Sequence, residues 1–144
     1  MPSITIDSPN LQKDGPLLEV HFLISSELEK KYKEEGKALP EPVVIKSLID
    51  TGASSCVIQG DIPERLNLQP VGEIKMCTPS CSDTSCFVYY MRMVIPSTGL
   101  IYEGPFIAAP LKVQQISCLI GRDVLKDSIL IYLGQKNQFT LSIL

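Results

Sequence analysis

The sequence has little of what several large classes of protein require. Its 144 residues include no tryptophan, one histidine and 6% aromatic residues, and the formal net charge is −3. Nucleic-acid binding uses an excess of lysine and arginine and aromatic rings that stack on bases, so we expect no nucleic-acid partner. No apolar run approaches the roughly 20 residues that cross a bilayer. The first residues, MPSITIDSPN, lack the basic and apolar regions of a secretory signal. We therefore expect a cytoplasmic protein without a membrane partner.

The cysteine content argues against two further classes. There are five cysteines, and an odd number does not favour a complete disulfide framework. Three of them lie in CTPSCSDTSC (77–86), but zinc usually takes four ligands and the single histidine, His21, is distant in sequence. We therefore expect no metal and no cofactor. Two interpretations stay open for Cys77, Cys81 and Cys86. They are free thiols, which we prefer, or they form a redox switch that closes a disulfide. Cys56 and Cys118 stand in apolar surroundings and are expected in the core.

The rest of the composition is that of one folded domain. Apolar residues make up 44% and charged residues 20%, and the length allows a substantial core. Segments rich in β-branched and aromatic residues alternate with proline, glycine and polar turns, which predicts strands at 4–6, 17–24, 43–49, 87–95, 100–102, 129–133 and 139–144. Short helices are predicted at 25–36, 62–68 and 121–127. We expect a mostly β single domain over residues 1–144.

The stretch LIDTGASSCVI (48–58) places an acid between apolar residues. Burying a carboxylate is costly unless it is paired or hydrogen-bonded, so Asp50 needs an explanation. A strand-like run ends at Ile49, and Gly52 permits a tight turn and a close approach by another chain. Such a turn could present Asp50 to a second acid. Two adjacent carboxylates share one proton, and the pair can activate water while polarising a carbonyl. A polar turn without catalytic use is the alternative for an isolated Asp-Thr-Gly.

Two motifs together resemble the retropepsin-type aspartic peptidases. LIDTGASSCVI is similar to the active-site loop of that family, and CLIGRDVL (118–125) is similar to its second signature. About seventy residues separate them, and the resemblance covers roughly residues 43–144. It implies a closed, barrel-like β domain with a flap hairpin and one short C-terminal helix. The 25–36 helix is then expected as an insertion in the N-terminal hairpin.

The resemblance implies a role for each motif residue. Asp50 would be the catalytic acid, supported in its loop by Thr51, Gly52 and Ala53. Gly121, Arg122 and Asp123 would be structural residues of the second motif. Because the chain carries one Asp-Thr-Gly, a pair of acids needs two copies of the chain, so a symmetric homodimer is expected. The terminal FTLSIL is expected to pair with its copy between subunits, and pairing within its own subunit is the alternative left open.

The flap departs from the family pattern. It is expected at residues 74–90, where a family member usually has glycines at the tip, and this segment has none. Contact with substrate is expected from Cys77, Thr78, Pro79 and Ser80. Tyr89 and Tyr90 should point to opposite sides of the strand. Ala53 cannot donate a hydroxyl hydrogen bond to Asp50, so we expect a mildly acidic activity optimum.

The resemblance implies an aspartic endopeptidase that acts on a peptide or protein substrate as a homodimer. Asp50 from each copy would activate the attacking water, with no metal. The alternative is a catalytically silent dimer of the same fold that binds peptides or partner proteins. The glycine-free flap favours this alternative, whereas the intact Asp-Thr-Gly argues against it, because a binding module gains nothing from a costly pair of acids.

Overall fold

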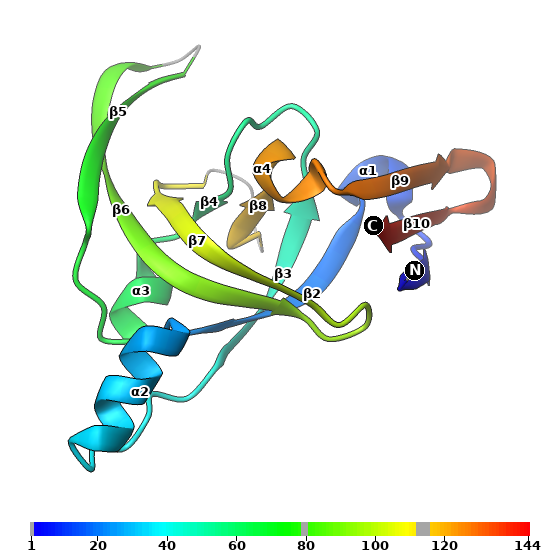
Figure 1. Ribbon diagram of the computed structural model, residues 1–144. Helices are drawn as coiled ribbons and strands as arrows, with labels where there is room; N and C mark the ends of the chain where they lie inside the picture. Colours follow the sequence, from blue (N-terminus) through cyan, green and yellow to red (C-terminus); the bar gives the residue numbers. More distant parts are fainter. Residues whose placement is uncertain (1, 79–80, 112–115) are drawn as a thin grey trace.

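The chain folds as a mostly β protein, as the strand-like segments predict. The computed structural model describes residues 2–78, 81–111 and 116–144 (Figure 1). The strands are β1 (Ser3–Asp7), β2 (Leu17–Leu23), β3 (Val43–Ile49), β4 (Val57–Ile58), β5 (Gly72–Thr78), β6 (Cys81–Ile95), β7 (Leu100–Ala108), β8 (Cys118–Ile120), β9 (Ser128–Leu133) and β10 (Gln138–Ile143). The helices are α1 (Leu11–Asp14), α2 (Ser26–Glu34), α3 (Asp61–Arg65), α4 (Arg122–Leu125) and the 3-10 turn η1 (Gly134–Lys136).

Six strands close into a barrel. Their order is β2-β3-β8-β4-β7-β6, and β6 pairs back onto β2 through His21–Val94, Phe22–Met93 and Leu23–Arg92. The pairs β3–β8 and β4–β7 are parallel, and the other pairs are antiparallel. Each of the six strands therefore has a neighbouring strand on both sides in the ring. The closed barrel agrees with the expected fold class.

The barrel encloses the hydrophobic core. Phe22 on β2 and Phe106 on β7 are fully buried and meet edge to face with ring centroids 5.2 Å apart. Such a pair contributes about 0.5–1.5 kcal/mol beyond the area it buries. Cys56 and Cys118 are also fully buried, as their apolar surroundings predict. Both are free thiols.

The segment expected to be the flap lies in the antiparallel hairpin of β5 and β6. Gly72 pairs with Val88 and Lys75 with Ser85, and the register shifts between Met76 and Thr78. Figure 1 shows the hairpin extending away from the barrel. The backbone of Cys77 and Thr78 lies in β5, whereas Pro79 and Ser80 lie outside the described residues. Cys86 is a free thiol, but it is buried rather than exposed in a polar loop.

A separate three-stranded sheet has the order β1-β10-β9. Strand β10, at the centre, pairs antiparallel with β1 on one side and with β9 on the other. The expected pairing of FTLSIL with its copy is therefore wrong, because both edges of β10 are already used within the subunit. The reason lies at the N-terminus, where Ser3 and Thr5 form hydroxyl hydrogen bonds to Ser142 (2.7 Å) and Thr140 (2.8 Å).

Helix α2, in the segment expected as an insertion, lies between β2 and β3 in the chain. Ser25 caps it, because its hydroxyl accepts a hydrogen bond from the Leu28 N–H at 3.2 Å. The helix buries none of its residues. Leu28 and Tyr32 nevertheless pack, partly buried, against the hydrophobic core, and polar contacts add to this in fixing the helix on the barrel.

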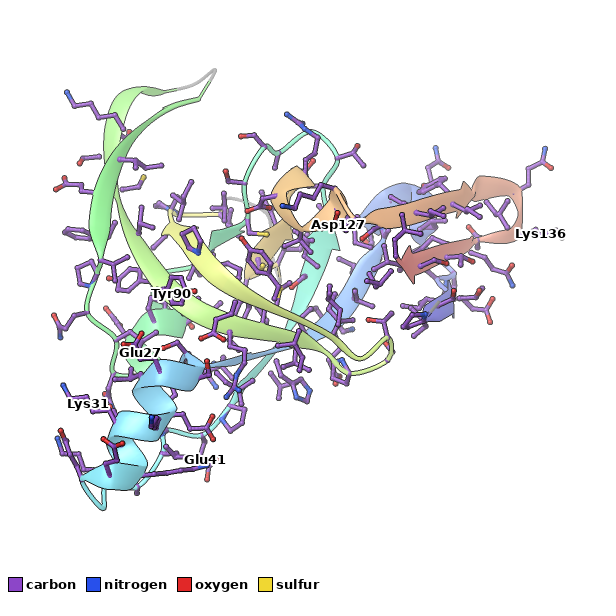
Figure 2. The ribbon with its side chains drawn as sticks, viewed as in Figure 1. Glu27, Lys31, Glu41, Tyr90, Asp127 and Lys136 are labelled. Carbon is purple, nitrogen blue, oxygen red and sulfur yellow. The ribbon has the colours of Figure 1, made fainter. Side chains whose placement is uncertain are left out.

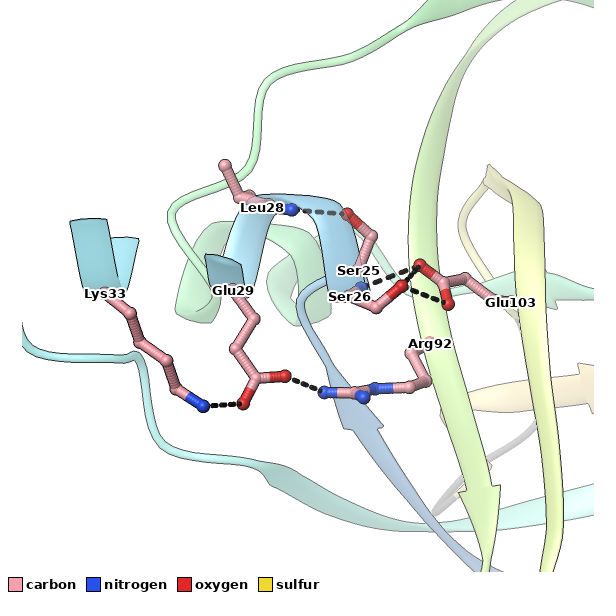
Figure 3. A network of polar contacts seen from close by, with 7 residues as sticks. All are labelled: Ser25, Ser26, Leu28, Glu29, Lys33, Arg92 and Glu103. Carbon is pink, nitrogen blue, oxygen red and sulfur yellow. Dashed lines mark hydrogen bonds and ion pairs between the residues drawn. The ribbon is translucent and has the colours of Figure 1, made fainter. Parts of the chain in front are cut away.

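Hydrogen bonds between two pairs of residues join α2 to the barrel (Figure 3). Arg92 on β6 donates to Glu29 at 2.7 Å, and the N–H and hydroxyl of Ser26 donate to Glu103 on β7 at 2.7 and 3.0 Å. The Arg92 hydrogen bond, followed by that from Lys33, lowers the pKa of Glu29. These contacts hold the helix against the outer face of β6 and β7.

The other two predicted helices are shorter than expected, and α1 and η1 were not predicted. The segment predicted at 62–68 is helical only in α3, and Asn67 follows with a left-handed φ of 54°. The segment predicted at 121–127 is helical only in α4. None of the helices in the described part of the chain combines the length and apolar character needed to cross a membrane.

Candidate active site

The candidate active site is centred on the loop that follows β3. Strand β3 lies in the barrel between β2 and β8, and Asp50 comes directly after its buried last residue, Ile49. The Asp50 N–H donates to the carbonyl of Ile120 at the end of β8 (2.9 Å). The Asp50 carbonyl accepts a hydrogen bond from the Ala53 N–H at 3.2 Å. The barrel therefore fixes the position of Asp50 through the main chain.

The Asp50 side chain is half-buried and turns back over its own loop. Its Oδ1 accepts a hydrogen bond from the Gly52 N–H at 2.9 Å. A Cβ atom at Gly52 would lie 3.1 Å from the same oxygen, so glycine gives the carboxylate room. Thr51 and Gly52 are exposed. The carboxylate thus stands at an open loop, where a second molecule can reach it.

Gly121 allows the second motif to pass directly behind this loop. A Cβ atom there would lie 2.6 Å from the Ser55 carbonyl carbon, 2.7 Å from its oxygen and 2.9 Å from its nitrogen. Real Cβ atoms essentially never come within 3.0 Å, and a backbone neighbour cannot move aside cheaply. The backbone angles of Gly121, φ −91° and ψ −177°, are extended and suit any residue. The need for glycine here is purely steric.

Arg122 and Asp123 secure the two loops to each other through hydrogen bonds. The Arg122 N–H donates to the Ala53 carbonyl (2.8 Å), and its guanidinium donates to the Thr51 carbonyl (2.7 Å). Asp123 accepts hydrogen bonds from the Cys56 N–H (3.1 Å) and the Val124 N–H (2.9 Å). Because α4 begins at Arg122, these contacts also fix the helix beside the loop.

Cys56 has a role that the sequence reading missed. Its thiol donates to Asp123 Oδ1 at 3.2 Å and accepts from the Gly121 N–H at 3.3 Å. The sequence indicated only a small buried residue. The signal that could have shown this role was the position of Cys56 within the first motif. Once the two loops are known to meet, that position lies opposite the second motif.

The buried thiols are not candidate nucleophiles. Burial raises the pKa of Cys118 to about 12 and raises that of Cys56 further still. A nucleophilic cysteine needs a lowered pKa so that the thiolate is populated near neutral pH. Cys56 and Cys118 therefore remain protonated. The acid–base candidates in this region are the carboxylates, of which Asp123 accepts hydrogen bonds from Cys56 and Val124, whereas Asp50 lies beside the exposed Thr51 and Gly52.

Two tyrosines of the segment expected to be the flap point to opposite sides of β6. Tyr89 packs against the core, whereas Tyr90 is 45% exposed on the other side of the strand. Tyr90 lines a pocket of about 540 Å³ together with α2 residues Glu27 and Lys31 (Figure 2). This pocket contains no residue of either motif. Tyr90 therefore belongs to the groove at α2, away from Asp50.

No described side chains form an alternative metal centre. Among the residues that the structure describes, no cluster of three or more histidine, cysteine, aspartate or glutamate side chains could hold a metal ion. His21 is partly exposed, and its Nε2 lies 3.2 Å from Glu19 Oε1.

Comparison with known proteins supports the fold. No protein-family model matches the sequence, and no curated protein matches it significantly. Among solved structures, the chain is similar to a retropepsin-like aspartic protease from Rickettsia conorii, with a TM-score of 0.55 and 13% identity over 96% of this chain and 89% of that one. The retroviral protease-like domain of Ddi1 from Leishmania major matches with a TM-score of 0.43 and 14% identity, over 88% of this chain and 87% of that one. The first similarity and the closed barrel show that the chain has a retropepsin-like fold.

Proposed function

We propose that the protein is an aspartic endopeptidase that works as a homodimer. The observation that carries the proposal is the half-buried Asp50 carboxylate at an exposed loop, held from behind by the second motif on a retropepsin-like barrel. The close contact at Gly121 supports it, because catalysis requires reacting groups to be positioned closely.

The chemistry needs two carboxylates, and each chain supplies one Asp-Thr-Gly. In the proposed dimer the two Asp50 side chains share one proton. The ionised carboxylate removes a proton from water, the water oxygen attacks the peptide carbonyl carbon, and the protonated carboxyl gives its proton to the carbonyl oxygen. Collapse of the intermediate breaks the C–N bond, and the amine leaves with a proton from the pair.

The exposed Thr51 and Gly52 are the residues that would meet across the twofold axis. Ala53, whose N–H is bonded to the Asp50 carbonyl, completes the loop. The whole chain, 1–144, would form one peptidase domain, in which 25–36 is an insertion away from the site. The segment 74–90 would close over an extended substrate peptide, with Cys77, Thr78, Pro79 and Ser80 at its tip. The apolar motif surroundings favour hydrophobic side chains on either side of the cut.

A catalytically silent dimer that binds peptides is the second candidate. One observation favours it, which is that the flap segment 74–90 contains no glycine. Glycine helps such a hairpin bend over a substrate. The silent dimer would bind peptides and leave them uncut.

Cleavage of a mixed peptide library between pH 4 and pH 7, read by mass spectrometry, separates the two candidates. We expect cuts from the native chain and none from Asp50→Asn, in which the amide oxygen can still accept from Gly52. Asp61→Asn, at an exposed position that begins α3, is the matched control and should cleave normally. A native sample shown to be dimeric that binds peptides without cutting them would establish the silent module instead.

A further inference from the structure

Strand β9 is an edge strand with an unusual exposed surface. It is the outer strand of the β1-β10-β9 sheet, and β10 is its strand partner among the described residues. Large apolar side chains are exposed along it, at 41% to 50%, namely Ile129, Ile131, Tyr132 and Leu133. The whole strand, SILIYL, carries no charge, and the nearest charged residues are Asp127 before it and Lys136 after it (Figure 2).

The two other outermost strands of the sheets, β5 and β1, are protected differently. The edge strand β5 exposes Glu73 and Lys75, and the edge strand β1 exposes Ser3, Thr5 and Asp7. Charged and polar residues on an edge prevent unwanted pairing with another chain. Strand β9 lacks this protection along its whole length, which is typical of an edge that pairs with a partner.

The outer face of the sheet has an ordered pattern across its three strands. Side chains alternate between the two faces, so Leu130 packs on the core while Ile129, Ile131 and Leu133 share the outer face. Beside them, β10 and β1 carry polar pairs that are hydrogen-bonded to each other, namely Ser142 with Ser3, Thr140 with Thr5, and Gln138 with Asp7. The apolar residues thus form a strip confined to the free edge, which we call the β9 strip (Ile129, Ile131 and Leu133).

We propose that β9 pairs antiparallel with β9 of a second copy of this chain, and that this is the contact that assembles the dimer. The inference rests on the proposed function, because a site with one Asp50 is incomplete without a second copy. Its partner is identical and equally uncharged, so two β9 strips can meet without any charge being buried. The result is a continuous six-stranded sheet with the order β1-β10-β9-β9-β10-β1.

Symmetry fixes the register of this pairing. A twofold axis perpendicular to the sheet keeps each face on its own side, and residues directly opposite in an antiparallel pair point to the same face. The axis must therefore pass midway between one residue and its own copy, so that this residue lies directly opposite itself. Centring on Ile131 places Ile131 opposite its own copy and Ile129 opposite Leu133 of the other copy. No other centre within β9 pairs all three residues of the β9 strip.

The position of β9 in the chain connects this interface to the site. Arg122 at the start of α4 binds the Thr51 carbonyl, and β9 begins at Ser128, shortly after α4 ends at Leu125. Figure 1 shows β9 leaving α4 directly. An interface at β9 therefore lies on the same continuous segment that contacts the Asp50 loop.

Disulfide trapping tests the contact and its register. A disulfide needs Cα atoms within about 7 Å, so Ile131→Cys should cross-link to its own copy under mild oxidation, whereas Ile129→Cys alone should not. A mixture of Ile129→Cys and Leu133→Cys chains should cross-link with each other. The unsubstituted chain, treated in parallel, shows the background from native cysteines. Absence of cross-linking above that background at position 131 would overturn the register.

A charge at the axis tests whether the contact holds the dimer. Ile131→Lys places two lysines opposite each other, so we expect the dimer dissociation constant to rise at least about tenfold. Thr5→Lys, on the same face but at the β1 edge, should leave it unchanged. Sedimentation measures both. An Ile131→Lys chain that stays dimeric, or a native chain that is monomeric while cleaving peptides, overturns the proposal. A native dimer that is dissociated by Ile131→Lys but never cleaves leaves the interface established and removes the proposed activity.

Discussion

Replacing Gly121 by alanine tests the contact between the two motif loops. The added Cβ atom would lie 2.6 Å from the Ser55 carbonyl carbon, so the loop or the strand must move. The extended backbone at Gly121 suits alanine, and no conformational strain is added. Overpacking of this kind costs about 1–3 kcal/mol.

Gly60→Ala is the matched control. Gly60 precedes α3 as Gly121 precedes α4, and both are N-cap positions without a side-chain cap. A Cβ atom at Gly60 would meet nothing within 4 Å. The effect of alanine on the unfolded chain is therefore shared, and neither glycine has a backbone conformation that alanine cannot adopt, so the difference between the variants reports the steric contact.

We expect Gly121→Ala to be less stable than Gly60→Ala by about 1–3 kcal/mol in urea denaturation followed by circular dichroism. At about 2–4 °C per kcal/mol, its melting temperature should be roughly 2–12 °C lower. If the chain is a peptidase, kcat/KM should fall as well, because a shift of 1 Å at a catalytic group can cost about 100-fold. Equal stability and equal activity of the two variants would refute the close contact.

Two further predictions concern residues away from the reacting atoms. Cys56→Val should be less stable than Cys56→Ser by about 1–3 kcal/mol in urea denaturation, because valine leaves the buried Gly121 N–H without its acceptor; equal stabilities would contradict the thiol hydrogen bonds. Arg92→Gln should lower stability at neutral pH, since the hydrogen bond from Arg92 lowers the pKa of Glu29 and stabilises its ionised form. The loss of stability relative to the native chain should shrink as the pH falls below 4.5, the ordinary pKa of glutamate, and through the lower pKa of Glu29 in the folded chain. A difference in stability that persists unchanged at pH 3 would contradict this prediction.

The sequence predicted the long strands well, because their residues carry the pattern themselves. The segments 17–24, 43–49 and 87–95 coincide with β2, β3 and most of β6. Strands β4 and β8 were missed, since two or three residues are too short for any periodic signal and their pairing depends on distant segments. Strand β5 and the first residues of β6 are rich in polar residues and gave no strand signal, although they form a hairpin.

The candidate site was predictable where one residue type is required. Asp50, Gly52 and Gly121 stand out because chemistry or close packing permits few substitutes. Cys56 was not predictable as a hydrogen-bonding residue, because its thiol partners come from another part of the chain. The pairing of the last strand was wrong for a similar reason. Whether FTLSIL has a free edge depends on where β1 lies, and nothing within FTLSIL reports that.

The structure separates positioning from chemistry at this site. Asp50 is placed by main-chain bonds to Ile120 and Ala53, and the Gly52 N–H meets a side-chain oxygen that asparagine also provides. Removing the acid should therefore leave the loop intact, whereas adding one methyl group at Gly121 should move the loop while leaving the acid in place. Loss of cleavage in Asp50→Asn at unchanged stability, together with loss of both properties in Gly121→Ala, would distinguish the acid from its support. If Asp50→Asn lost stability to the same extent, the carboxylate charge itself would be part of the loop structure, and the loop could not be treated as a fixed frame for catalysis.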